Sequence, residues 1–321
     1  MKFFSRLAIA LLFAGAAAGA FAAYPEKPVR IVIGFPAGGP LDQHARLLTD
    51  RLQAVLGQPI IIDYKAGAGG TVGAQEVMKA APDGYTLMLA NTGVMVINPA
   101  LYTKLPYQTT RDFTPIARTA MQPLALLVNP KVPVNSLREF IAYARTRPGQ
   151  INYGSAGNGG ISHLVPEMFK SATGLFMVHI PYRGSAPAFT DLMGGQVQFM
   201  AESIPQAAAY HKQGRVKALA VTSRERNPAL PDTPTVIESG IPGFEVVGFY
   251  GFLAPAGLPN DVKAKLSDAF RQVMTSADIR GRMVAQGADP AFLGSEEFTK
   301  FLNAEMPRWA EAVKKSGARL D

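Results

Sequence analysis

The chain has 321 residues, of which 48% are hydrophobic, and a formal net charge of +8. It contains no cysteine, which excludes disulfides, thiolate metal sites and a cysteine nucleophile. The positive charge is spread without a run of Lys or Arg, so it favours an anionic ligand only weakly and gives no case for nucleic-acid binding.

Residues 1–22 have the pattern of a secretory signal peptide. Lys2 and Arg6 precede an apolar stretch from Leu7 to Ala20, and small residues follow it. We expect cleavage directly after this segment and export of the rest of the chain. No later stretch reaches the ~18 apolar residues of a membrane helix, so we expect the mature chain not to be inserted in a membrane.

Strand and helix patterns alternate along the first part of the mature chain. A β-branched run at residues 29–34 predicts a buried strand, and apolar residues at helical spacing predict a helix that ends near Leu56. Further strands are predicted at residues 59–63 and 85–90, with a helix between them. This alternation is typical of a parallel sheet that is covered by helices on both faces.

Loops rich in glycine follow the predicted strands. The first loop, residues 35–42, has the sequence Phe-Pro-Ala-Gly-Gly-Pro-Leu-Asp and leaves backbone N–H groups open at the start of a helix. Such a helix start suits a carboxylate or a phosphate, although a plain turn between strand and helix is an equal alternative. Residues 67–73 and 91–93 are expected at the same edge, where parallel sheets bind their ligands.

The second half of the chain repeats this arrangement. Residues 101–112 have no clear period and predict an irregular excursion before a strand at 124–128. Residues 151–160 then form a strand that leads into a second Gly-rich loop. The remaining predicted strands are 177–181, 197–200, 216–222 and 244–253, and the remaining predicted helices are one capped by Ser136 and those at 162–171, 186–193, 205–212, 261–275, 277–286 and 295–316.

Two similar strand-loop-helix units in separate halves predict two domains whose loops face each other across a cleft. The chain crosses between the halves near Leu124 and near Phe249, and these crossings are expected to form a hinge. We therefore expect a first domain of residues 23–124 plus 247–321 and a second domain of residues 125–246.

Common cofactor patterns are weak or missing. Residues 67–73 come close to the dinucleotide pattern G-x-G-x-x-G, but Val72 takes the place of the third glycine and no ribose-binding acid follows. His44 and His163 lie just inside the helices after the two Gly-rich loops and are either cleft residues or ordinary helix residues. No two histidines have the spacing of a metal pair, so we expect neither a metal nor a cofactor.

Polar side chains near the loops have both a functional and a structural interpretation. Asp42 is either a cap or turn acceptor or a site residue. Ser155 and Ser162 have no assignable base, so we interpret them as hydrogen-bond donors to an anion rather than as nucleophiles. Arg183 is expected either to pair with a carboxylate or to face solvent, and Glu202 is expected to line the cleft.

Several ordered motifs resemble one known family over essentially the whole mature chain. They are Phe35-Pro-Ala-Gly-Gly-Pro-Leu-Asp42, Ala66-Gly-Ala-Gly-Gly, Ala81-Pro-Asp-Gly-Tyr-Thr, Asn152-Tyr-Gly-Ser-Ala-Gly-Asn-Gly, Ser162-His-Leu, His179-Ile-Pro-Tyr-Arg-Gly-Ser-Ala-Pro-Ala, Leu192-Met-Gly-Gly-Gln-Val and Ala218-Leu-Ala-Val-Thr-Ser. The chain resembles the periplasmic solute receptors of tripartite tricarboxylate transporters, which are also called the Bug-type family.

The resemblance implies an α/β fold with two domains that close like a clamshell, of the type II-like periplasmic binding proteins. Each domain would be a mostly parallel sheet flanked by helices, and the C-terminal helices would return to the first domain. A small carboxylate would lie in the cleft. The implied site residues are Phe35, Ala37, Gly38, Gly39 and Asp42 on one wall and Ser155, Ala156 and Gly157 on the other, with Asn91, Thr92, Ser162, His163, Arg183, Asp191 and Glu202 as further candidates.

Two positions depart from the family pattern. Pro40 and Leu41 stand where family members often carry Ser-Thr, so a polar contact is expected to be lost there. Glu202 stands where many relatives have the shorter Asp, which is expected to reshape the far end of the pocket. Both departures leave the ligand open among dicarboxylates, tricarboxylates, aromatic acids and acidic amino acids.

The expected function is that of a monomeric periplasmic receptor, not an enzyme, that delivers a small organic carboxylate to the integral-membrane subunits of a transporter. One alternative is a receptor of the same shape that signals to a membrane sensor kinase. A second alternative, from another class, is a secreted serine hydrolase that uses Ser155 or Ser162.

Overall fold

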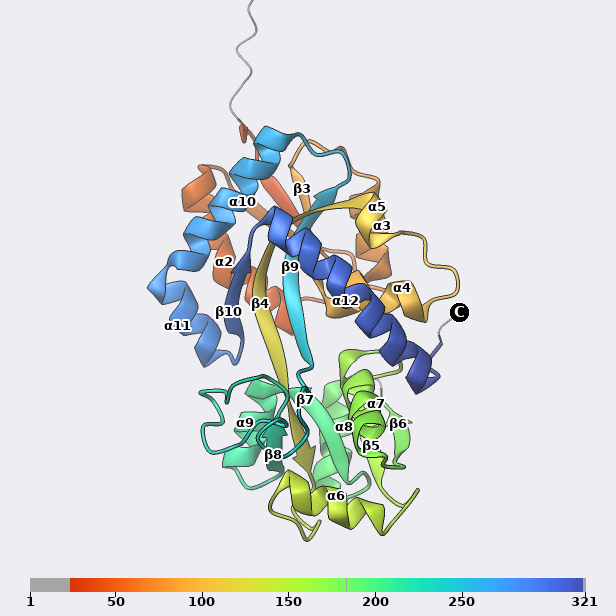
Figure 1. The fold of residues 1–321 in the computed structure, drawn as a ribbon. Coiled ribbons are helices and arrows are strands. Elements are labelled where there is room, and N and C mark those ends of the chain that lie inside the picture. The colour runs from red at the N-terminus through yellow and green to blue at the C-terminus, as the bar shows by residue number, and fades with distance from the viewer. Residues whose placement is uncertain (1–23, 183, 320–321) are drawn as a thin grey trace, which may run out of the picture.

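The structure is a computed structural model that describes residues 24–182 and 184–319. The predicted signal peptide and Arg183 therefore lie outside the described residues. The described chain forms two lobes that are joined by long strands (Figure 1). The second lobe, coloured green, lies below the first in this view, and both ends of the described chain belong to the first lobe or lie beside it.

The elements follow the predicted alternation. The first lobe begins with β1 (Val29–Ile33), α2 (Pro40–Leu56), β2 (Ile60–Tyr64), η1 (Ala68–Gly70), α3 (Thr71–Met78), β3 (Thr86–Asn91), η2 (Gly93–Ile97), α4 (Asn98–Leu101) and α5 (Thr109–Asp112). β4 (Phe113–Val128) leads into the second lobe, which contains α6 (Leu137–Arg145), β5 (Asn152–Ser155), α7 (Ile161–Thr173), β6 (Val178–Pro181), α8 (Ser185–Gly194), β7 (Phe199–Ser203), α9 (Ile204–Lys212) and β8 (Lys217–Val221). The chain returns to the first lobe through β9 (Val247–Pro255), α10 (Asn260–Thr275), α11 (Ala277–Ala285), β10 (Asp289–Leu293) and α12 (Ser295–Ser316).

Each lobe contains a unit of three parallel strands. In the first lobe β1 lies between β2 and β3 and pairs with both in parallel, and in the second lobe β5 lies between β6 and β7 in the same way. Val29, Ile31, Val32 and Ile33 of β1 are buried, as expected of a strand covered on both faces. The loops that follow β1, β3, β5 and β7 thus leave their sheets at the carboxyl ends of parallel strands.

β4 joins the two sheets. It pairs antiparallel with β9 as far as Pro123 and then with β7 and β8 from Leu124 onward. β9 pairs antiparallel with β3 of the first lobe. The two crossings therefore lie side by side between the lobes, as Figure 1 shows.

The predicted extent of β4 was wrong. The sequence predicted a strand only at residues 124–128 and assigned residues 113–123 to no element, whereas β4 begins at Phe113. Pro115 and Pro123 have no N–H group to donate to a neighbouring strand. The sequence around them therefore did not predict a strand. β4 accommodates proline through irregular pairing between Pro115 and Ala117. The strand β10 was missed because its residues are only partly buried and show no clean alternation.

The C-terminal helices cover the first lobe. α10 packs against α2, and the Phe270 ring lies 4.2 Å from the ring of Phe252 in β9. α12 buries Phe298, Leu302 and Trp309 and contacts both α4 of the first lobe and α7 of the second (Figure 1). The chain end thus completes the first lobe and touches the second.

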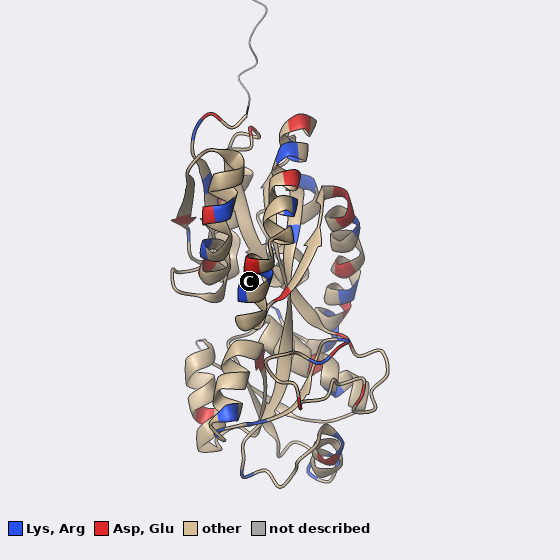
Figure 2. Cartoon of the chain, turned by 90° about the vertical axis from the view of Figure 1, so that its left-hand side faces the viewer, with Lys and Arg blue, Asp and Glu red and all other residues tan. Residues whose placement is uncertain are grey.

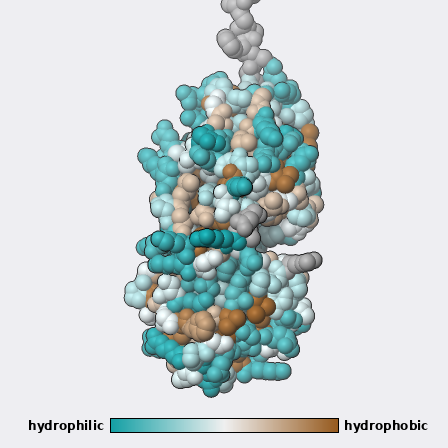
Figure 3. Space-filling view, turned by 90° about the vertical axis from the view of Figure 1, so that its right-hand side faces the viewer, coloured by the Kyte–Doolittle hydropathy of each residue, from teal (hydrophilic) through white to brown (hydrophobic). Residues whose placement is uncertain are grey.

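The outer surface carries mixed charge and small apolar patches. Lys or Arg and Asp or Glu alternate over the outer helices in Figure 2. Most of the face in Figure 3 is hydrophilic, with the larger hydrophobic patches in its lower half. Among the exposed hydrophobic side chains, Ile61 and Val178 lie on β2 and β6, the outer strands of the two parallel units.

None of the helices in the described ranges has the length and apolar character needed to cross a membrane.

Candidate ligand-binding site

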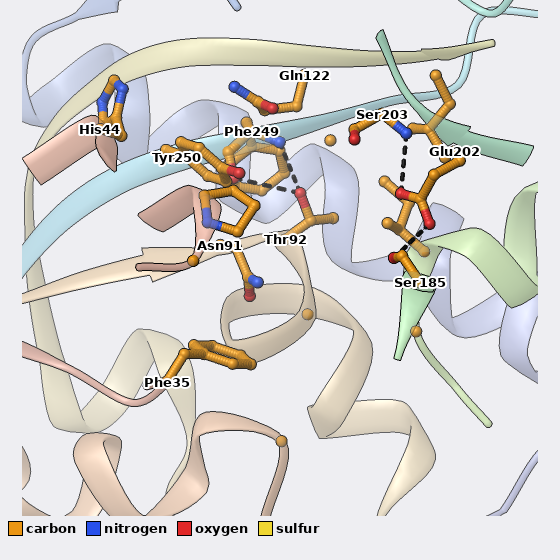
Figure 4. Close-up of a pocket in the computed structure, with 18 of the residues that line it drawn as sticks. Phe35, His44, Asn91, Thr92, Gln122, Ser185, Glu202, Ser203, Phe249 and Tyr250 are labelled. Atoms are coloured by element: carbon orange, nitrogen blue, oxygen red, sulfur yellow. Dashed lines mark hydrogen bonds between the residues drawn. The ribbon is translucent and has the colours of Figure 1, made fainter. Parts of the chain in front are cut away.

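A cavity of about 650 Å³ lies between the two lobes. Its walls come from the loop after β1, the ends of β3 and β7, the loop after β5, the starts of α8 and α9, and the crossings β4 and β9. Figure 4 shows part of this lining, with Phe35 and His44 on one side and Glu202 and Ser185 on the other. The carboxyl ends of parallel strands from both lobes therefore meet at one cavity.

The first wall is the loop that leads into α2. Gly38 has a φ of +83°, which favours glycine, and its N–H donates to Asp42 Oδ2 at 2.7 Å. Gly39 is the N-cap of α2 in extended conformation and has no side-chain cap. Gly38 and Gly39 both line the cavity, and the N–H of Gly39 has no hydrogen-bond partner among the described residues. This N–H and the helix start behind it are available to a negatively charged group.

Asp42 shapes this loop from behind. Its carboxylate also accepts hydrogen bonds from Arg46 Nε at 2.8 Å and from the Tyr64 hydroxyl at 2.6 Å. Burial alone would raise the pKa of Asp42, but the donors Tyr64 and Gly38 and the charge of Arg46 lower it below the ordinary value. Asp42 and Ala37 do not line the cavity. Asp42 is thus a turn acceptor that orients Gly38.

We expect Asp42→Asn to lower the unfolding free energy by about 2 kcal/mol, because the uncharged amide loses part of three donor contacts. The pKa of Asp42 is lowered in the folded state, so its contribution is present above the ordinary value near 3.8 and is lost as the pH falls through the folded pKa. Urea unfolding of wild type and Asp42→Asn at pH 7 and at pH 3 measures the difference in unfolding free energy between them. Asp50→Asn on the exposed face of α2 is the matched control, and equal losses in both variants would contradict the role of Asp42.

The second wall begins three residues later than the sequence predicted, at Asn158 instead of Ser155. The residues that line the cavity are Asn158, Gly159, Gly160 and Ile161, whereas Ser155, Ala156 and Gly157 lie behind them. A Cβ on Gly159, whose φ is +73°, would lie 2.1 Å from Leu101 Cδ2 of the first lobe. The lobes therefore touch here, and a side chain at Gly159 would push them apart.

The serines predicted for the second wall form an internal network. Ser155 is fully buried, and its hydroxyl accepts a hydrogen bond from Gly157 N–H at 3.2 Å. Ser162 Oγ accepts from Ala156 N–H at 3.0 Å. Asp191 accepts from the Tyr182 hydroxyl at 2.6 Å and lies outside the lining. Each of these side chains is hydrogen-bonded to another group of the second lobe, and its contact with a ligand stays a prediction.

Two stacked histidines support the second wall. The rings of His163 and His179 lie 3.8 Å apart and nearly parallel. His163 Nδ1 accepts from Gly159 N–H at 3.0 Å, and His179 Nε2 lies 2.6 Å from Ser155 Oγ. Burial lowers the pKa of each histidine to about 4, so both rings are neutral at pH 7. Neither ring lines the cavity.

Aromatic residues form one part of the cavity lining, which we call the floor. Phe35, Phe249 and Tyr250 line it, and the His44 ring meets Tyr250 edge to face at 5.1 Å. His44 Nε2 lies 2.8 Å from Thr119 Oγ1, and burial lowers the pKa of His44 to about 4. An aromatic floor with a neutral histidine suits the apolar body of a ligand.

Polar groups connect this floor to the strands. Thr92 Oγ1 accepts from Phe249 N–H at 2.7 Å and ties β3 to β9. Asn91 Oδ1 accepts from Val94 N–H at 3.1 Å. Both side chains line the cavity, as the sequence predicts for the end of β3 (Figure 4).

Glu202 lies at the far side of the cavity (Figure 4). Its carboxylate accepts from Ser185 Oγ at 2.6 Å and from Ser203 N–H at 2.9 Å. Burial raises the pKa of Glu202, and these two donors offset that rise only in part. Arg183, the basic candidate of the sequence, lies outside the described residues.

Sequence reasoning missed part of the lining. The missed residues include Tyr102, Gln122, Ser185, Gln206, Phe249, Tyr250 and Gln286. Ser185 belongs to the motif that begins at His179, whereas most of the others lie on the crossings or at helix ends without a motif, so only the tertiary fold brings them to the cavity. Asn158–Gly160 could have been found, since they belong to the predicted Gly-rich loop. Within the described ranges no cluster of three or more His, Asp or Glu could bind a metal ion.

Two α/β lobes that enclose a cavity at the carboxyl ends of their parallel strands define a periplasmic-type solute-binding protein, which confirms the predicted fold class. The chain belongs to the family of tripartite tricarboxylate transporter receptors, whose family model matches residues 44–318.

Individual relatives agree with this assignment. Protein BugT of Bordetella pertussis is 34% identical over 92% of this chain and 91% of its own length. A structure of an R. palustris protein with adipate is 33% identical and has a TM-score of 0.83 over 92% of this chain and all of its own. MatC from Rhodopseudomonas palustris with bound malate is 35% identical and has a TM-score of 0.77 over 90% of this chain and all of its own.

Proposed function

We propose that this protein binds a small organic carboxylate between its lobes and delivers it to the membrane subunits of a tripartite tricarboxylate-type transporter. The observation that carries the proposal is the cavity between two Gly-rich loops, each at the carboxyl end of a parallel strand. The adipate-bound and malate-bound relatives support a carboxylate as ligand.

One carboxylate of the ligand binds at the first wall. The N–H of Gly39 and the start of α2 supply donors and a partial positive charge there. The donors that the first wall offers are backbone groups without a full charge. Binding through neutral donors keeps the affinity moderate and allows release to the transporter.

The lobes close on the ligand about the two crossings. In this proposal domain 1 is residues 23–124 plus 247–321, and domain 2 is residues 125–246. The exchange of strand partners between Pro123 and Leu124 supports the first of these boundaries. The ligand favours the closed state because it contacts both walls at once. Closure of a monomer is sufficient for this mechanism.

The chain reaches the periplasm through the signal peptide of residues 1–22, which is then removed. We further propose that the ligand is released unchanged and that the protein is not an enzyme. The one observation in favour of a hydrolase is the contact between Ser155 and His179. Ser155 is fully buried and outside the cavity lining, and no described carboxylate bonds to His179, so this pair lacks both access and an orienting acid.

A thermal-shift screen of carboxylates tests the proposed function. A ligand at about 100 times its dissociation constant adds about 2.7 kcal/mol of stability, which raises the Tm of a chain of this size by roughly 5 °C or more. We expect such a shift from at least one dicarboxylate, tricarboxylate, aromatic acid or acidic amino acid. A flat screen would contradict carboxylate binding. Uptake of the identified ligand by cells without the gene then separates transport, which predicts a loss, from sensing, which predicts none.

A further inference from the structure

His163 reaches back from the first turn of α7 to the second wall. The N-cap of α7 is Gly160, which makes no side-chain cap, and His163 is the third residue of the helix. Its Nδ1 accepts a hydrogen bond from the N–H of Gly159 at 3.0 Å. A Glu or Gln at this helix position often accepts from the N–H of the N-cap, and His163 reaches one residue further back. It therefore connects the helix to the loop before it.

The His163 ring is held in one orientation and one tautomer. It is buried and lies 3.8 Å from the ring of His179 and nearly parallel to it. Because a backbone N–H can only donate, Nδ1 of His163 is the unprotonated nitrogen, and the proton of the neutral ring is on Nε2. The lone pair of Nδ1 is thus fixed in its direction toward Gly159.

This hydrogen bond separates bonded amides of the second wall from open ones. Three N–H groups of the loop after β5 bond to side chains of the same lobe, and they belong to Ala156, Gly157 and Gly159. The N–H groups of Asn158 and Gly160 have no hydrogen-bond partner among the described residues, and both residues line the cavity. Because a peptide group is planar, a fixed N–H of Gly159 also fixes the direction of the Asn158 carbonyl.

The same hydrogen bond lies at the point where the lobes touch. Gly159 has a φ of +73°, a left-handed conformation that glycine adopts without strain. A Cβ built there would lie 2.1 Å from Leu101 Cδ2 of α4, so the bare backbone of Gly159 packs directly against the first lobe. A rotated peptide at Gly159 would therefore change this contact as well as the open amides.

We propose that His163 is a positioning residue for ligand binding, which holds Gly159 so that the second wall can bind the ligand and meet the first lobe. This inference rests on the proposed function and adds to it a residue that acts only through the loop. The donors that the second wall then offers are the N–H groups of Asn158 and Gly160. Because the His163 ring does not line the cavity, its effect on affinity comes from the loop and not from a contact with the ligand.

Two substitutions of His163 separate the acceptor from the ring. Asparagine has an oxygen or nitrogen where histidine has Nδ1, and leucine has a methyl group there, while both remove the stacked ring. The probes are malate, adipate, citrate, benzoate and glutamate, together with any hit of the wider screen. Calorimetry at pH 7 measures the affinity for each probe that binds wild type. We expect His163→Leu to bind at least about tenfold more weakly, because the N–H of Gly159 loses its acceptor, and His163→Asn to stay within about threefold of wild type.

Phe140→Leu is the matched control for a general loss of stability. Phe140 is fully buried in the second lobe, where its ring stacks on Phe199, and it lies outside the cavity lining. We expect this variant to have a lower Tm and unchanged affinity. A residue with a merely structural role would instead give affinities that follow the Tm across the three variants.

Three results would overturn the proposal. They are wild-type affinity in a folded His163→Leu, equal losses in His163→Leu and His163→Asn, and affinities that follow the Tm. In each case wild type still binds a probe, so the proposed function survives. If wild type binds no probe and the wider screen is flat, the proposed function fails and this inference fails with it.

Amide hydrogen exchange of the wild type, resolved by residue with NMR, tests the proposal without a variant. We expect the amide of Gly159 to be protected in the ligand-free protein, and the amides of Asn158 and Gly160 to exchange at least about tenfold more slowly once a probe is bound. A Gly159 amide that exchanges as fast as these two neighbours in the ligand-free protein would overturn the proposal, even if His163→Leu does not fold.

Discussion

Gly39→Val is expected to abolish binding of the carboxylate while the fold remains intact. Gly39 has a φ of −77° and a ψ of 174°, a conformation that valine adopts readily. A Cβ built there meets only the carbonyl oxygen of Pro36, at 3.5 Å. The added methyl groups therefore occupy open space at the first wall, where they block the approach to the Gly39 N–H.

We expect the affinity to fall at least about a hundredfold, which is a loss of roughly 2.7 kcal/mol. The Tm of the ligand-free protein should change by no more than roughly 2 °C, as for a substitution that creates neither strain nor a cavity. Isothermal titration and thermal unfolding measure the two quantities. Gly281→Val on the exposed face of α11, where a Cβ meets no neighbour, is the matched control and should bind normally. Full affinity in Gly39→Val would remove the first loop from the site.

The second large effect is loss of stability in weak acid. Burial lowers the pKa of His44, His163 and His179 to about 4, whereas the unfolded histidine titrates near 6.5. Protonation therefore favours the unfolded chain. The stabilising effect is fully present above about pH 6.5 and is lost as the pH falls to about 4. For His44, which is almost completely buried, this amounts to about 3 kcal/mol.

Urea unfolding from pH 8 to pH 4 measures this loss. The glutamine of His44→Gln can still bond to Thr119 but does not titrate. We therefore expect the unfolding free energy of this variant to fall less steeply than that of wild type between pH 6.5 and pH 4. Gln213→Asn, at the exposed end of α9, adds no titratable group and should follow the wild-type curve. Asp42 titrates below this window and Glu202 acts in the opposite sense, so neither produces the slope. A wild-type stability that is constant from pH 7 to pH 4.5 would contradict neutral buried histidines.

Local patterns and the family resemblance together predicted most of the architecture. Each strand-loop-helix unit is encoded by contiguous residues, such as the apolar run of β1 followed by the helical spacing of α2. Because both units were visible in the sequence, the two-domain α/β fold followed from them and from the family resemblance. The extent of β4 did not, since Pro115 breaks the local signal and pairing with β9 restores the strand. β10 likewise exists only through its pairing with β4.

The candidate site was partly predictable for the same reason. Phe35, Gly38, Gly39, Asn91 and Thr92 lie in or directly after recognisable loops, and all of them line the cavity. The crossings contribute residues that carry no motif, and no local pattern places them beside the loops.

The partners of predicted side chains were also beyond the sequence. Ser155 was interpreted as a donor to an anion because no base was assignable, yet His179 lies within hydrogen-bonding distance of it. The carboxylate of Asp42 accepts hydrogen bonds from Gly38, Arg46 and Tyr64. Such pairings depend on the packing of neighbouring elements and not on spacing along the chain.

A crystal structure with the tightest carboxylate from the screen tests the central claim most directly. We expect the ligand between the two Gly-rich loops, with one carboxylate oxygen within hydrogen-bonding distance of the Gly39 N–H and the opposite end beside Glu202. A ligand found on an outer face of either lobe, with the space between Gly39 and Asn158 filled only by solvent, would contradict it.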